Sequence, residues 1–204
     1  SELVDAALWT VAKVLLEGVA LVVVILLVFL GDIRSSVIVV ATLILTPLLT
    51  FFVMNQFGIS ANLMSLGGLA VAIGLMVDGS VVVVENAFGH LGRPNKYGKR
   101  KVHIILKAVV EVATPVVFGI GIIILVFLPL MTLKGMEGKM FAPLAFTIAI
   151  ALAISLLLSL TLTPVLSSYL LKGGAEHDTR LVGYLKKHYL RMLDWLLANA
   201  KKTV

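Results

Sequence analysis

The stretch that decides the fold is residues 67–86, which read GGLAVAIGLMVDGSVVVVEN. It overlaps most of an apolar segment, Leu63–Val84, in which Asp78 is the only charged side chain. A helix needs about 20 mostly apolar residues to cross the hydrocarbon core of a bilayer. The segment therefore predicts a transmembrane helix that carries a carboxylate inside the membrane.

The composition of the whole chain agrees with a membrane protein. Of its 204 residues, 60% are hydrophobic and 14% are charged, and the mean hydropathy is +1.09. Soluble domains are roughly 45–50% apolar and about 25% charged, so this surplus of apolar side chains requires lipid as solvent. The chain has no cysteine, which excludes disulfides and thiolate metal sites within it.

Four further segments resemble the first in length and hydrophobicity. They are Val14–Leu30, Val37–Met54, Val112–Leu133 and Ala142–Leu171. Inside a bilayer every backbone polar group must be satisfied within the structure, and long continuous apolar segments favour helices over barrel strands. The sequence predicts an all-α integral membrane protein, with a bundle of five transmembrane helices at 14–171.

The positions of the basic residues predict the orientation. If the N-terminus lies outside, the segments 31–36, 86–107 and 170–204 are cytoplasmic and hold 14 of the 17 Lys and Arg residues. Cytoplasmic loops carry such an excess. We therefore expect residues 1–13 to be a periplasmic extension of the first span and the C-terminus to be cytoplasmic. Because the basic residues report orientation, nucleic acid is not an expected partner.

The region 172–204 differs from the spans. From residue 179 to residue 198, apolar side chains recur at helical spacing, and Lys186, Lys187 and Arg191 occupy the other face. This pattern is typical of an amphipathic helix lying on the cytoplasmic membrane surface. A helix packed on a partner domain would show the same pattern.

Asp78 is the residue most indicative of function. A carboxylate at such a depth costs about 2.5–3.5 kcal/mol on insertion scales, and such residues usually face a bundle interior, a cavity or a partner cation. Gly74 lies one turn earlier on the same face, and small residues let neighbouring helices approach. We interpret Asp78 as a proton-relay carboxylate; the alternative is a residue that only hydrogen-bonds a neighbouring helix.

Three other residues of this segment are candidates. Glu85 follows Asp78 by two helical turns, about 10 Å along the same face. It is either a second proton-relay group or an ordinary residue at a helix end. Met64 and Met76 carry thioethers, which can bind soft metal ions but more often only fill apolar space.

Several motifs resemble one family of transporters. Ala72-Ile73-Gly74, Asp78-Gly79-Ser80 and Val84-Glu85-Asn86 resemble the fourth transmembrane helix of resistance–nodulation–division (RND) efflux pumps. The stretch 133–147, LKGMEGKMFAPLAFT, is similar to the heavy-metal efflux branch, and 159–164, SLTLTP, resembles the superfamily more generally. The likeness covers nearly the whole chain.

The resemblance implies the fold and activity of a larger assembly. The five spans would be helices two to six of a twelve-helix inner-membrane transporter, and the tail would be the surface helix before helix seven. Such pumps are secondary transporters, not enzymes: proton flow through the membrane domain drives export. They work as trimers with a periplasmic adaptor and an outer-membrane channel. Asp78 falls on the family's relay Asp, and Glu85 on the Glu of its downstream motif.

The chain departs from the family patterns at informative positions. Divalent-metal members often carry another Asp six residues before the relay Asp, where this chain has Ala72. This favours the copper and silver type, although that type has further methionines where Leu152 and Ser167 stand here. Multidrug members usually have two adjacent Asp residues, whereas here Gly79 follows Asp78. The hypotheses are therefore a heavy-metal cation exporter, a multidrug or hydrophobe exporter, and a non-transport membrane scaffold.

Overall fold

The computed structural model describes residues 2–92, 100–171, 183–184 and 187–193. Its helices are α1 (Glu2–Leu30), α2 (Ile33–Gln56), α3 (Leu63–Gly92), α4 (Lys101–Met131), α5 (Gly135–Leu160) and α6 (Leu162–Leu170). The described part of the chain is 91% helical and contains no strand. The prediction of an all-α membrane bundle is confirmed.

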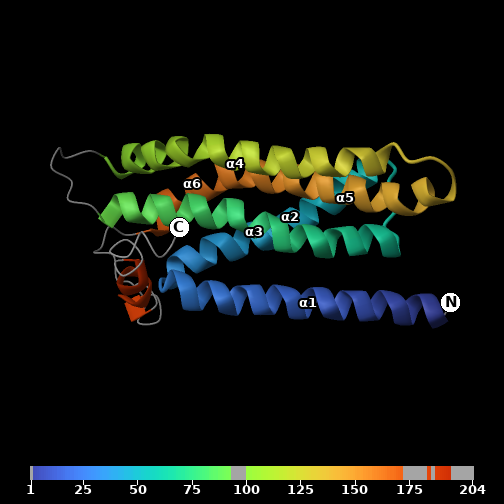
Figure 1. Cartoon of the computed structure of the whole chain (residues 1–204), viewed down its shortest axis with the longest axis horizontal. Helices are drawn as coiled ribbons and strands as arrows, with labels where there is room; N and C mark the ends of the chain where they lie inside the picture. Colours follow the sequence, from blue (N-terminus) through green and yellow to red (C-terminus); the bar gives the residue numbers. More distant parts are fainter. Residues whose placement is uncertain (1, 93–99, 172–182, 185–186, 194–204) are drawn as a thin grey trace, which may run out of the picture.

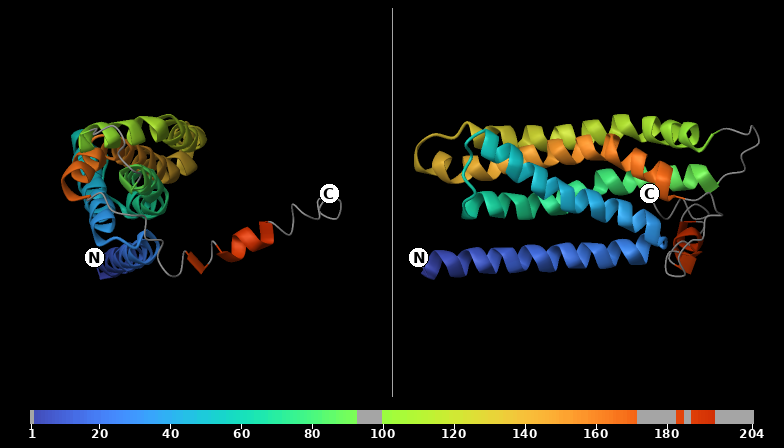
Figure 2. Two further views of the ribbon diagram at one scale, coloured as in Figure 1. Left: turned by 90° about the vertical axis from the view of Figure 1, so that its left-hand side faces the viewer. Right: turned by 180° about the vertical axis from the view of Figure 1, so that it is seen from behind.

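The helices lie side by side along the long axis of the molecule, and α2 crosses the others obliquely (Figure 1, Figure 2). Helix α3 is central, because it contacts each of the five other helices. Helix α1 lies along one side and packs on α2 and α3. The segment with Asp78 therefore forms the middle of the bundle.

Four stretches of the described chain are long and apolar enough to cross a membrane: α2, α3, α4 and the pair α5–α6. Helix α1 contributes a shorter apolar stretch, Leu16–Ile25, within one continuous helix. Many large apolar side chains lie on the outer surface, including Phe118 and Val126 on α4, each 67% exposed. A surface of this kind requires lipid or a further protein as its neighbour.

Two helices extend beyond the predicted spans at the same end of the bundle. Helix α3 continues to Gly92, and α4 begins at Lys101, eleven residues before the predicted start at Val112. Hydropathy detects only the apolar part of a helix, so these polar ends were missed. The Lys101 ammonium donates a hydrogen bond to the Ser168 carbonyl at 2.5 Å, which ties the start of α4 to the end of α6.

The predicted span over 142–171 corresponds to α5 and α6, which together are long and apolar enough to cross a membrane, but the helix is interrupted within it. The chain breaks between α5 and α6 at Thr161, whose φ and ψ are −114° and −65°. Pro164 explains the position of the break, since it has no N–H to donate to the carbonyl one turn earlier. The helix also begins sooner than expected, at Gly135, whose φ of +78° suits a glycine.

The predicted amphipathic helix lies largely outside the described residues. Within it, residues 183–184 and 187–193 are helical, and the rings of Tyr184 and His188 stack with centroids 5.9 Å apart. Its position on a membrane surface stays a prediction.

Candidate functional site

One face of α3 is open along most of its length. Val71 and Val82 are 48% and 40% exposed, Asp78 and Glu85 are exposed, and a Cβ added at Gly67 or Gly74 would meet nothing within 4 Å. These residues recur every three or four positions, so they share one side of the helix. We call this side the open face of α3; it comprises Gly67, Val71, Gly74, Asp78, Val82 and Glu85.

Carboxylates within membrane spans usually face a bundle interior, a cavity or a cation, but Asp78 is exposed in the described part of this chain. The other five helices pack around the rest of α3 and leave the open face uncovered, so the carboxylate is exposed. Within residues 2–92 and 100–171, no basic group forms an ion pair with Asp78. An Asp facing hydrocarbon would cost about 2.5–3.5 kcal/mol, so this exposure favours a further protein element against the open face.

The opposite side of α3 is closely packed and joined to its neighbours by hydroxyl groups. The Thr42 hydroxyl of α2 donates to Ser80 Oγ at 3.1 Å, and Ser80 Oγ lies 2.8 Å from Ser159 Oγ of α5. One turn earlier, the Ser155 hydroxyl donates to the Met76 carbonyl at 3.0 Å. These bonds are buried and fix the rotation of α3, which determines where Asp78 points.

The two methionines do not converge on one point. Met76 is 2% exposed within an apolar cluster that includes Leu69, Ile148 and Leu152, whereas Met64 is half-buried. Twelve residues separate them, about 18 Å along a helix, so the two sulfur atoms cannot bind one ion together. The described residues also hold no group of three or more His, Asp or Glu side chains placed to bind a metal. A role in metal binding stays a prediction for each methionine separately.

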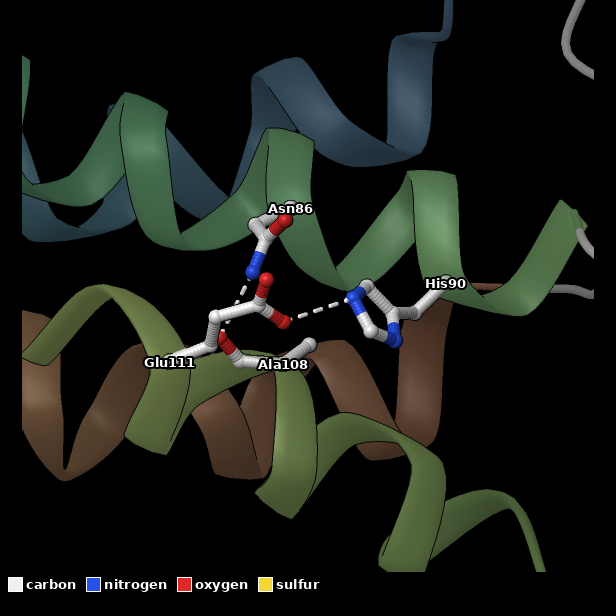
Figure 3. A network of polar contacts seen from close by, with 4 residues as sticks. All are labelled: Asn86, His90, Ala108 and Glu111. Atoms are coloured by element: carbon white, nitrogen blue, oxygen red, sulfur yellow. Dashed lines mark hydrogen bonds and ion pairs between the residues drawn. The ribbon is translucent and has the colours of Figure 1, made fainter.

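A second polar group joins α3 to α4 near the end of the bundle (Figure 3). The Asn86 side-chain amide donates to the Ala108 carbonyl at 2.7 Å, and His90 Nε2 lies 3.0 Å from a carboxylate oxygen of Glu111. His90 is 12% exposed and Glu111 is 59% exposed. Sequence reasoning missed His90 and Glu111, and the one available signal was an acidic residue directly before the apolar run of the fourth span.

Helix α3 is thus held by hydrogen bonds on one side and carries an exposed carboxylate on the other side. The exposed side is suited to packing against a further transmembrane helix. The chain belongs to the RND efflux transporters, because the family model described as the AcrB/AcrD/AcrF family matches residues 1–204. Its relatives place it in the heavy-metal efflux branch.

Individual relatives agree with this class. The chain is 43% identical over 207 residues to the cobalt-zinc-cadmium resistance protein CzcA of Cupriavidus metallidurans, covering 98% of this chain and 19% of that protein. It is 36% identical over 208 residues to the cation efflux system protein CusA of Escherichia coli K12, covering 96% of this chain and 20% of that protein. It thus spans about a fifth of the length of these curated relatives.

A solved structure shares the arrangement of the helices. A crystal structure of a heavy metal efflux pump matches 80% of this chain and 16% of its own, with 41% identity and a TM-score of 0.68. This chain therefore matches a part of that structure both in sequence and in the arrangement of its helices.

Proposed function

We propose that this chain is part of the membrane domain of a proton-driven heavy-metal cation exporter, and that Asp78 takes up and releases the transported proton. The observation that carries the proposal is the position of Asp78 on the open face, as the one charged residue of the apolar segment Leu63–Val84. Glu85, two turns further on this face, is the second group on the proton route.

The open face of α3 is suited to a contact with another helix that can change its arrangement. Gly67 and Gly74 offer no side chain, so a helix from the rest of the transporter can pack closely there. A change in the protonation of Asp78 exchanges a charge for a neutral dipole in this contact. If that helix carries a cation, the ionised carboxylate of Asp78 attracts it and the protonated carboxyl does not. The contact then has two arrangements, and the protonation of Asp78 selects between them.

Membership in the family supports a larger assembly. We propose that the remaining transporter covers the open face, and that the complete pump is a homotrimer with a periplasmic adaptor and an outer-membrane channel. The two alternatives to a metal exporter, a membrane scaffold and a multidrug or hydrophobe exporter, are less well supported. A scaffold does not account for the match to efflux transporters over the whole chain, and relatives named for resistance to metals favour a metal exporter over a multidrug exporter.

Two observations on the ion disagree. Ala72 lacks the additional carboxylate of divalent-metal members, which favours copper or silver, whereas identity is higher to CzcA than to CusA. Ala72 is fully buried among apolar side chains and does not lie on the open face. We therefore propose a heavy-metal cation as the substrate class, and a tolerance test distinguishes the two types.

A complete transporter that carries this segment is expected to raise the metal tolerance of an efflux-deficient bacterium. Growth would be measured against copper, silver, zinc, cobalt, cadmium and a panel of hydrophobic drugs, with the empty vector as control. Increased tolerance to one group of metals, without a change in drug tolerance, is the expected result. Tolerance gained only to drugs would contradict the proposal.

The orientation can be tested separately, because the chain contains no cysteine. We expect Arg100→Cys to be cytoplasmic and Lys134→Cys to be periplasmic, in a complete transporter freed of other cysteines. Both positions are exposed. An impermeant thiol reagent applied to intact cells should label Lys134→Cys and leave Arg100→Cys unlabelled until the membrane is opened. The reverse pattern would show that the chain is inverted.

A further inference from the structure

A row of hydroxyl side chains runs along α5 and α6 inside the bundle. Ser155, Ser159, Thr163 and Ser167 follow one another at intervals of four residues, and each is 2% exposed or less. Residues four apart lie on the same face of a helix, so the row forms one continuous ridge across the break at Thr161. We call these four residues the hydroxyl ridge.

The two halves of the ridge differ in their hydrogen bonds. Ser155 donates to the Met76 carbonyl, and Ser159 contacts Ser80 and donates to the Ser155 carbonyl. Thr163 Oγ1 and Ser167 Oγ are also buried, yet neither has a hydrogen-bond partner among the described residues. The difference begins at the break between the helices.

The absence of partners at Thr163 and Ser167 is unusual within this molecule. Of the twelve buried Ser and Thr side chains in the described chain, the other ten are hydrogen-bonded. Buried hydroxyls in helices commonly donate to the carbonyl one turn earlier, as Thr46 and Thr50 do at 2.7 Å. Buried polar groups in native proteins are nearly always bonded, either to protein or to ordered water.

The carbonyl oxygen of Leu160 lies on the same face as the hydroxyls of Thr163 and Ser167. Pro164 has no N–H, so it cannot donate to the Leu160 carbonyl as a residue in a regular helix would. Positions 160, 163 and 167 fall on one face of the chain. The break therefore gathers two unpartnered hydroxyls and one carbonyl without its usual donor.

We propose that this end of the hydroxyl ridge is a binding site for ordered water, held by Thr163, Ser167 and the Leu160 carbonyl. Buried waters typically make about three hydrogen bonds to groups that would otherwise be unsatisfied. Ordered water is also one of the means by which a broken transmembrane helix satisfies the backbone groups it frees. The site goes beyond the proposed export and does not depend on it.

The charges around α6 favour a neutral ligand over a cation. Helix α6 has no acidic residue, and the Lys101 ammonium is bonded to the carbonyl of Ser168, next to Ser167. The carboxylate of Asp32, at the start of α2, is already bonded to Ser35. Within helix α6 a metal ion would find no carboxylate, and it would meet the positive charge of Lys101 nearby, whereas water can both donate and accept.

Radiolytic footprinting of the complete transporter tests the site, because hydroxyl radicals formed from bound water oxidise buried side chains beside it. The reporter is Leu171, fully buried, whose N–H donates to the Ser167 carbonyl at 3.1 Å. The matched control is Leu152, equally buried on α5 within the apolar cluster. We expect Leu171 to be oxidised several-fold faster than Leu152.

Variants separate bound water from bulk solvent. Thr163→Val with Ser167→Ala should slow the oxidation of Leu171 to the rate of Leu152, whereas Thr163→Ser, which keeps the hydroxyl, should leave it unchanged. Equal, slow oxidation of both leucines in the unaltered transporter would overturn the proposal. So would fast oxidation of Leu171 that persists in the double variant. Neither readout depends on transport, so failure here is distinct from failure of the proposed export.

Discussion

Replacing Asp78 with Asn in a complete transporter is expected to abolish metal export while the protein is still inserted at the normal level. Asn keeps the size of the side chain and its ability to hydrogen-bond, but it cannot bind and release a proton. It therefore imitates only the protonated carboxyl, and the contact at the open face stays in one arrangement. Metal tolerance of cells, with the amount of membrane-inserted protein measured alongside, checks this result.

Glu85→Gln is the matched control, because it makes the same chemical change on the same face of α3. We expect a smaller loss, since Glu85 lies beyond the apolar segment Leu63–Val84, where water can replace a lost proton carrier. Equal tolerance in Asp78→Asn and in the unaltered transporter would assign Asp78 a structural role only.

Gly68→Ala is expected to disrupt the packing of α3 against α5. A Cβ at Gly68 would lie 2.7 Å from the Leu144 carbonyl oxygen and 3.2 Å from Leu144 Cα. Both atoms belong to the backbone, so the helices themselves must move apart. Overpacking of this kind typically costs about 1–3 kcal/mol.

Gly119→Ala on α4 provides the control, because Gly119 is exposed and does not belong to the open face of α3. Its Cβ would meet nothing within 4 Å, and alanine is favoured over glycine in a helix by about 1 kcal/mol. Thermal unfolding of the purified transporter in detergent should give a clearly lower Tm for Gly68→Ala only. Equal Tm values for both variants would show that the close approach of α3 and α5 does not limit stability.

The spans could be predicted from the sequence because membrane insertion leaves a strong local signal. An apolar segment as long as Leu63–Val84 is typical of a transmembrane helix, and Asp78 is its one charged residue. The predicted distribution of helices was therefore correct in outline. The boundaries at Gly92 and Lys101 were not, since the polar ends of these helices carry no hydropathy signal.

Contacts between helices could not be predicted, because they depend on rotation and register. Ser80 and Ser159 are 79 residues apart, and nothing near either residue indicates the other. The interruption at Thr161 has a local signal in Pro164, but proline is tolerated inside α2 and α4. The sequence therefore did not show which of these prolines interrupts its helix.

The exposure of Asp78 also depends on how helix α3 is rotated about its axis relative to its neighbours. Its spacing from Gly74 and Glu85 placed the three residues on one face, as observed. The spacing could not show which neighbours cover that face, and in this chain none of the five other helices does. The bonds of Ser80 on the far side determine this orientation.

The role of Asp78 in carrying the proton is tested directly by proton flux in liposomes that contain the purified complete transporter, under an imposed pH gradient. A pH-sensitive dye would report proton movement with and without the metal that the tolerance test identifies. We expect metal-dependent proton flux in the unaltered transporter and none in Asp78→Asn. Metal-dependent flux that persists in Asp78→Asn would show that the proton does not pass through this carboxylate.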